Sequence, residues 1–314
     1  MSEKIRVGAV VGEAFEVGAK RWPALIRFFL LPVLVGGLLF CGVMAGMIDF
    51  AALRAETHVE DLQSFEKLLR VPLPVFIGFF TAVQAVFLLL ISGGAASFFR
   101  LVAIGEDRPG LAQLRLDGPA WRVFWSLAIL LLISAAIYAA AIAAAASVTG
   151  QSPATWLQEM FDFMRTATAD GGDAQLSHEK ARELFEKLSP LMLAAGFAFI
   201  PMLYVGVKLA AFPAASAVED RIALFQSFGM TFGHWWSILF SFILCAVAIV
   251  ILLIVVGISL AVLHGVGVAL LHGPSHIGGL LVIAVAAILS IGLRLVIAAV
   301  RLALPAIIYR RLAG

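Results

Sequence analysis

Three basic residues lie well inside long apolar stretches of the chain, where a charge needs a partner. They are Lys208, Arg294 and Arg301. Arg294 precedes Arg310 by sixteen residues, about 24 Å along a helix, and Arg301 follows Arg294 two turns later on the same face. No Asp or Glu lies inside any of these stretches, and a cation in hydrocarbon is costly unless it meets an anion or reaches the interface. The pattern predicts a cavity that binds an anionic group, most simply a lipid phosphate.

A second interpretation stays open for each cation. The long aliphatic stems of Lys and Arg can carry the charge to the membrane surface without any binding site. This interpretation suits Lys208, which is eleven residues before Glu219, and Arg301. Arg294 is deeper in its stretch, so the sequence leaves both interpretations open for that residue.

No other group of residues has the spacing of a known active site. His272 and His276 are four residues apart, but Gly273 and Pro274 oppose a helix between them, and no Asp, Glu or Cys lies close enough to complete a metal site. The chain has no H-E-x-x-H, G-x-S-x-G, Walker or C-x-x-C motif. The sequence therefore predicts no catalytic residues, no metal and no cofactor, and a protein that is not an enzyme.

The elements that position the three cations follow from the composition. The chain is 62% hydrophobic and 13% charged, whereas soluble domains are about half apolar and a quarter charged. Roughly 20 apolar residues let a helix cross a membrane. Six stretches meet this length and predict six transmembrane helices: Ala24–Ile48, Val71–Phe99, Val123–Val148, Leu191–Val218, Trp235–Leu263 and Ile277–Ile308.

The charges between these stretches predict the orientation of the chain. With six spans, both termini lie on one side of the membrane. That side carries fifteen cations and eight acids, and the opposite side carries seven cations and twelve acids. Because loops rich in Lys and Arg stay in the cytoplasm, both termini are predicted to be cytoplasmic. The net charge of +2 gives no reason to expect a nucleic acid partner.

A faint internal repeat of three units runs along the chain. Phe15–Trp22, Leu114–Trp121 and Phe228–Trp235 each place an apolar residue seven positions before a Trp that opens an apolar stretch. The residues before each Trp have the apolar spacing of an amphipathic helix. We predict an all-α polytopic membrane protein in three repeats, each an interfacial amphipathic helix followed by a helical hairpin. The repeats cover about residues 1–105, 106–218 and 219–314 of a single membrane domain.

The tripeptide Glu-Asp-Arg occurs before the second and the third unit, at Glu106–Arg108 and Glu219–Arg221. Acidic residues stabilise the positive end of a helix dipole, so each tripeptide predicts the beginning of an interfacial helix, with its Arg directed at lipid phosphates. Trp is frequent at the membrane surface. The predicted interfacial anchors are Trp22, Arg108, Trp121, Arg221, Trp235 and Trp236.

Small residues in the second stretch predict a close contact between helices. The segment Ser92–Ser97 reads SGGAAS, and small side chains let helix backbones approach one another in membranes. Packing within the chain is favoured over dimerisation, because a bundle of six helices has many internal faces.

Two segments together carry a resemblance to a known group of proteins. The amphipathic helix that runs into GHWWSILFSFIL and the ending ALPAIIYRRLAG resemble uncharacterised six-span bacterial inner-membrane proteins related to the membrane domain of glycerophosphoryl diester phosphodiesterases. The resemblance covers nearly the whole chain and rests on aromatic motifs, and the phosphodiesterase domain itself is absent. It implies a bacterial inner-membrane location and a link to lipids or the cell envelope, and it assigns no residue a role.

These observations lead to a ranked set of functions. The first is an inner-membrane protein that handles lipid without catalysis, by binding membrane lipids through their anionic phosphate headgroups. The second is a structural or assembly subunit of a larger membrane protein complex. The third is a small-solute transporter, which the sparse and scattered polar residues of the spans do not favour.

Overall fold

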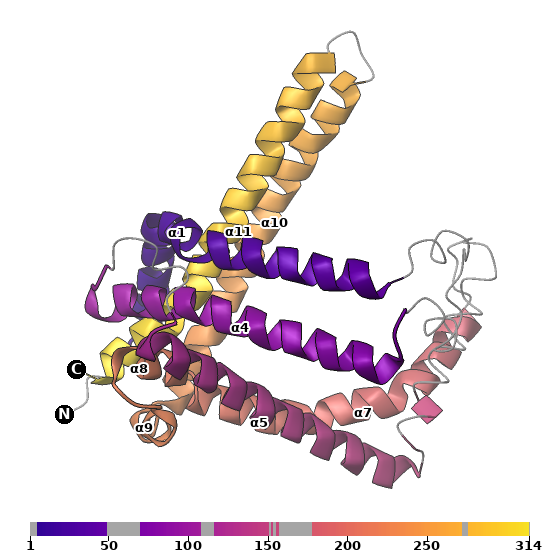
Figure 1. Cartoon of the computed structure of the whole chain (residues 1–314), viewed down its shortest axis with the longest axis vertical. Coiled ribbons are helices and arrows are strands. Elements are labelled where there is room, and N and C mark those ends of the chain that lie inside the picture. Colours follow the sequence, from indigo (N-terminus) through magenta and orange to yellow (C-terminus); the bar gives the residue numbers. More distant parts are fainter. Residues whose placement is uncertain are drawn as a thin grey trace. The chain divides into compact units, whose positions relative to one another are not determined.

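The computed structural model describes residues 5–48, 70–107, 116–150, 152, 155–156, 178–271 and 276–313. In this part of the chain, helices follow one another and no sheet forms (Figure 1). The helices are α1 (Val7–Met47), α4 (Leu73–Ile104), α5 (Gly118–Thr149), α7 (His178–Lys208), α8 (Phe212–Val218), α9 (Leu224–Met230), α10 (Trp235–Leu271) and α11 (His276–Ala313). The predicted all-α class is confirmed.

Within the described part of the chain, six helical stretches are long and apolar enough to cross a membrane. They are Val7–Met47, Val75–Ile104, Gly118–Thr149, Ser189–Val218, Trp235–Leu271 and Ile277–Ala313. Each contains most of one stretch predicted from the sequence. The chain is therefore a multi-pass membrane protein, as predicted.

The first repeat differs from the prediction, because its interfacial segment and its span form one helix. α1 continues through Trp22 and Pro23 without a break. Proline has a fixed φ near −65°, which a helix accepts, at the loss of one backbone hydrogen bond. In the third repeat the predicted separation does occur, because Gly233 takes a φ of +82° between α9 and α10, a conformation that favours glycine.

The fourth predicted stretch, Leu191–Val218, lies within the candidate span Ser189–Val218, but its helix is interrupted. α7 ends at Lys208, and α8 begins again at Phe212 with Pro213 in its first turn. Proline lacks the amide hydrogen that a continuous helix would use and clashes with the carbonyl four residues earlier, here Leu209. Pro305 does not interrupt α11, which is one continuous helix on both sides of this residue.

The chain divides into two compact units. The first unit holds residues Met1–Leu34, Leu88–Ser126 and Val207–Gly314, and the second holds Val35–Phe87 and Leu127–Gly206. In the second unit, Trp156 is buried against Ala145 and Ala194. The segments between the first and second and between the third and fourth predicted stretches lie mostly outside the described residues, and the threefold repeat stays a prediction.

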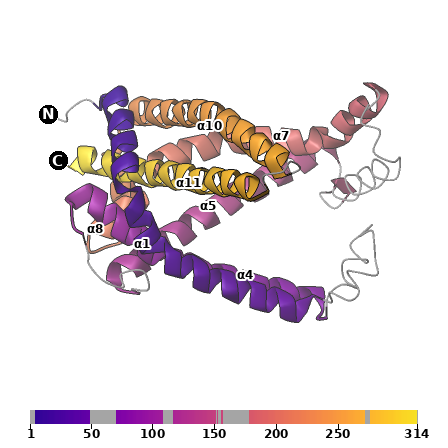
Figure 2. The ribbon, with the colours of Figure 1, turned by 90° about the horizontal axis from the view of Figure 1, so that it is seen from above.

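Close helix contacts in the first unit occur at glycines. A Cβ added at Gly94 would lie 2.6 Å from the carbonyl oxygen of Phe28, which confirms the close approach predicted for the small residues of the second stretch. α10 and α11 lie side by side in both views (Figure 1, Figure 2). Near their turn, Gly279 faces the backbone of Gly267, with 2.7 Å between an added Cβ and the Gly267 oxygen.

Candidate functional site

The aspartate of each Glu-Asp-Arg segment forms an ion pair that joins the two helices of one hairpin, where a hairpin is an outgoing apolar helix and the returning helix that follows it. Asp107, after α4, forms an ion pair with Arg27 of α1. Asp220, after α8, forms an ion pair with Arg122 of α5, with Oδ1 and Nη2 3.2 Å apart. In both cases the acid after the returning helix meets a cation near the beginning of the outgoing apolar stretch. The same pairing accounts for the recurrence of the tripeptide.

The third hairpin, formed by α10 and α11, ends without such an acid. Its last turn carries Arg310 and Arg311, and both form ion pairs with Glu13 of α1. The Nη2 atom of Arg311 lies 2.9 Å from Oε2 of Glu13. The last described helix is thus bound to the first.

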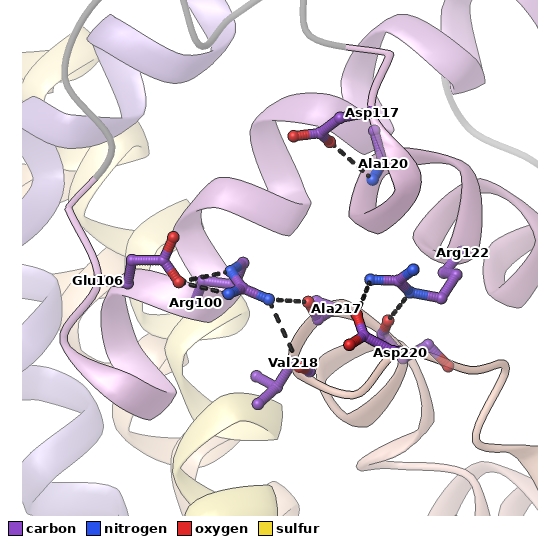
Figure 3. A network of polar contacts seen from close by, with 9 residues as sticks. Arg100, Glu106, Asp117, Ala120, Arg122, Ala217, Val218 and Asp220 are labelled. Atoms are coloured by element: carbon purple, nitrogen blue, oxygen red, sulfur yellow. Dashed lines mark hydrogen bonds and ion pairs between the residues drawn. The ribbon is translucent and has the colours of Figure 1, made fainter.

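Arginines also bind the carbonyl groups at helix ends, where no further turn of helix supplies a donor. Arg100 of α4 donates from Nη1 to the oxygen of Ala217 at 2.9 Å and of Val218 at 3.4 Å, and its other nitrogens bind Glu106 (Figure 3). Arg122 donates from Nε to Ser216 at 3.1 Å. Because the C-terminal end of a helix carries partial negative charge, these cations stabilise the end of α8.

The position of the second tripeptide corrects the prediction that it begins a helix. Glu219 is the residue that ends α8, and α9 begins only at Leu224, with no acid in its first turn. Oε1 of Glu219 instead accepts hydrogen bonds from Gln226 at 2.6 Å and Tyr309 at 3.2 Å. These two hydrogen bonds join the end of α8 to α9 and α11. Asp117, before α5, does accept from a helix-start amide, that of Ala120, at 3.3 Å (Figure 3).

The predicted interfacial anchors are mostly accessible where they are described. Trp121 and Trp236 are exposed, and Trp22 and Trp235 are half-buried. The rings of Trp235 and Trp236 contact edge to face, with centroids 4.6 Å apart. Arg108 lies outside the described residues. The membrane-surface role of these side chains stays a prediction.

Arg221, the remaining anchor, is exposed but has partners within the chain. Its Nε lies 3.2 Å from Glu219 Oε2, and its Nη2 lies 2.5 Å from Gln226 Oε1. Its side chain is 68% exposed, so it remains accessible to a phosphate.

Lys208 occupies a buried position beside α9. Its residue is 6% exposed, and its Nζ lies 5.6 Å and 5.2 Å from the ring centroids of Phe228 and Phe232. Both distances are within the range of a cation–π interaction. The hydroxyls of Ser227 and Thr231 donate to the Lys208 carbonyl oxygen at 3.2 Å each. These contacts tie the end of α7 to α9.

Arg301 lies in the wall of an apolar cavity between α10 and α11. The cavity has a volume of about 270 Å³. It is lined by Phe242, Cys245, Ala246, Ile249, Val250, Leu253, Arg301 and Leu304. Of the three predicted cations, Arg301 alone lines it. Lys208 and Arg294 are not part of the lining of this cavity.

Arg294 is exposed on α11. It lies seven residues before Arg301, about 10 Å along the helix and on the same face. Arg294 and Arg301 thus lie on the same exposed side of α11, and Arg301 is the one that lines the cavity.

Sequence reasoning missed the roles of Arg27, Arg100 and Arg122, which it counted only as inner charges. The two aspartates of the repeated tripeptide could have indicated these roles. Each aspartate follows the second helix of a hairpin in a chain with few charges, so it needs a nearby cation. The nearest cations are those at the beginning of the first helix of the same hairpin.

The chemistry available to these groups is anion binding. Among the described residues, no group of three or more His, Cys, Asp and Glu side chains could hold a metal, and the predicted histidine pair has no described side chains. Comparison of the chain with known protein families, curated proteins and solved structures gives no match. The resemblance to phosphodiesterase-related membrane proteins stays a prediction.

Proposed function

We propose that this chain is a non-enzymatic inner-membrane protein, with both termini in the cytoplasm, that binds an anionic lipid at Arg301. The observation that carries the proposal is the position of this arginine in the wall of an otherwise apolar cavity. A lipid is complementary to such a cavity, because its phosphate is anionic and can bind the arginine, while its acyl chains are apolar and can contact the apolar lining.

The dimensions of the cavity suit one acyl chain. Its lining runs from Phe242 to Leu253 along α10, and eleven residues of helix cover about 16 Å. A chain that begins at the level of Arg301 would pass Ile249 and Leu253 on its way to the hydrocarbon of the same leaflet.

The charge of the cavity supports a phosphate in particular. The guanidinium group binds two phosphate oxygens at once through parallel N–H donors. The described lining includes no carboxylate that would occupy Arg301. A phosphate from a lipid would supply a negative charge beside this exposed arginine.

Lipid that co-purifies with the protein tests this proposal. We expect Arg301→Leu to reduce the bound anionic lipid at least fivefold, Arg301→Lys to retain part of it, and Ala246→Phe to displace it by filling the cavity. Mass spectrometry of lipid extracted from protein purified in mild detergent would measure these amounts.

A matched control is Ala261→Phe, which adds the same ring to an exposed position of α10 outside the cavity lining. This variant should retain the lipid of the wild type. An unchanged lipid content in both Arg301→Leu and Ala246→Phe would contradict the proposal. A protein partner retained by every variant would instead support a role as a subunit of a larger complex.

A further inference from the structure

α11 is much longer than a membrane requires. Its 38 residues cover about 57 Å, whereas the hydrocarbon core is about 30 Å thick. Its partner α10 has 37 residues. Part of this hairpin must therefore lie outside the hydrocarbon, and the contacts of α1 indicate which part.

The N-terminal part of α1 packs directly on α11. A Cβ added at Gly18 would lie 3.3 Å from the oxygen of Val296 and 3.2 Å from the nitrogen of Val300. Within a turn of Gly18, Lys20 and Glu16 form an ion pair, with Nζ and Oε1 2.6 Å apart. The two side chains are 71% and 62% exposed.

An exposed ion pair belongs in water or among headgroups, because ionised side chains that face lipid are strongly disfavoured in hydrocarbon. The part of α11 that contacts Gly18 therefore lies at the level of the headgroups. Glu13, one turn before Glu16, binds Arg310 and Arg311. The part of α11 from Val296 to Arg311 is thus held at both ends against the charged segment of α1 that runs from Glu13 to Lys20.

Counting from the opposite end of the helix leads to the same level. Arg294 lies eighteen residues after His276, about 27 Å along the axis, close to the roughly 30 Å of the hydrocarbon core. On α10, the equivalent length from Leu271 reaches back to Leu253.

We infer that the cytoplasmic edge of the hydrocarbon core crosses the α10–α11 hairpin at Arg294. The outer halves of the two helices span the membrane, and the inner half of the hairpin lies in the headgroup layer. Arg294 and Arg301 then both face the phosphates of the cytoplasmic leaflet, Arg294 at the edge of the hydrocarbon and Arg301 farther toward the cytoplasm. This revises the depth expected for Arg294 by counting back from Arg310, because the last half of α11 does not lie in hydrocarbon.

The surface of α10 before Leu253 agrees with an oblique position of this part of the helix at the membrane interface. One side of it exposes apolar side chains, at Trp236, Phe240, Ile243, Leu244 and Val247. These continue the exposed apolar surface of the outer part of α10, at Ile251, Ile254 and Ile258. A helix that lies in the interface buries such a side in the hydrocarbon while its opposite side stays among headgroups.

Single cysteines on either side of Arg294 test the inferred boundary. Ile291 and Ala298 lie seven residues apart, nearly on one face of α11, and are exposed and half-buried respectively. The background would be Cys41→Ser with Cys245→Ala, since these are the two native cysteines. In inverted membrane vesicles, a membrane-impermeant maleimide should label the Ala298→Cys variant at least tenfold faster than the Ile291→Cys variant.

Labelling in detergent provides the control, since the two rates should become similar once the bilayer is removed. Equally slow labelling in vesicles would move the boundary toward Arg310 and overturn the inference. Equally fast labelling would overturn it too, by taking Ile291 out of the hydrocarbon. Ala287 and Leu302 form a second pair on this side of the helix, should one of the first two variants fail to fold.

The result is independent of lipid in the cavity. The labelling rates depend on depth alone, so they remain informative if Arg301→Leu leaves the bound lipid unchanged. Conversely, loss of lipid in that variant would stand even if the boundary were elsewhere.

Discussion

Replacing Arg100 by leucine is expected to lower the free energy of unfolding by about 3 kcal/mol, since hydrogen bonds to a charged group contribute about 1.5–3 kcal/mol each but share one side chain here. The Arg100 side chain is only 15% exposed. Its loss would leave the carbonyl groups of Ala217 and Val218 without this donor and Glu106 without its cation. Unfolding by SDS in mixed micelles would measure the change.

Arg221→Leu is the matched control for this variant. Arg221 also pairs with an acid, but its side chain is 68% exposed, and exposed ion pairs contribute about 0–1 kcal/mol. The control should therefore unfold nearly as the wild type does. Equal destabilisation by the two variants would show that the capping of α8 is not what makes Arg100 important.

Gly279→Ala is expected to have a second large effect, by forcing α10 and α11 apart near their turn. The new Cβ would lie 2.7 Å from the oxygen of Gly267 and 2.7 Å from the nitrogen of Leu271. Both atoms belong to the backbone, so no side-chain rotation relieves the contact. Overpacking of this kind costs about 1–3 kcal/mol, and the upper end applies here. The same SDS titration would detect it.

The control lies on the same helix. Gly292 has no atom within 4 Å of an added Cβ, and alanine is a better helix former than glycine by about 1 kcal/mol. Gly292→Ala should therefore leave stability unchanged or slightly raised. If Gly279→Ala behaved in the same way, the tight contact of the two helices at their turn would be refuted.

The helices were predictable because hydrophobicity over 20 or more residues decides them. The interruptions were harder to predict, since proline acts differently at each site. Pro213 begins a new helix, while Pro23 and Pro305 lie inside continuous ones. The difference depends on whether neighbouring groups can satisfy the freed carbonyls, as Ser227 and Thr231 do for Lys208 at the end of α7, and such partners come from other parts of the chain.

The candidate site was predictable residue by residue but not as an assembly. Lys208, Arg294 and Arg301 stood out as cations in apolar surroundings, and charge scarcity alone identifies them. Their separation could not be foreseen, because it follows from how α9 packs on Lys208 and how α10 packs on Arg301. The duplicated tripeptide was recognised as meaningful, yet its partners Arg27 and Arg122 became evident only with the hairpins in place.

The binding of Glu13 to Arg310 and Arg311 has a consequence for biogenesis. The Glu13–Arg311 pair is separated by 298 positions, and a ribosome adds about 5–20 residues per second, so the first helix must wait roughly 15 to 60 s for these cations. Until α11 is synthesised, the N-terminal part of α1 therefore lacks the two cations that bind Glu13 in the folded chain.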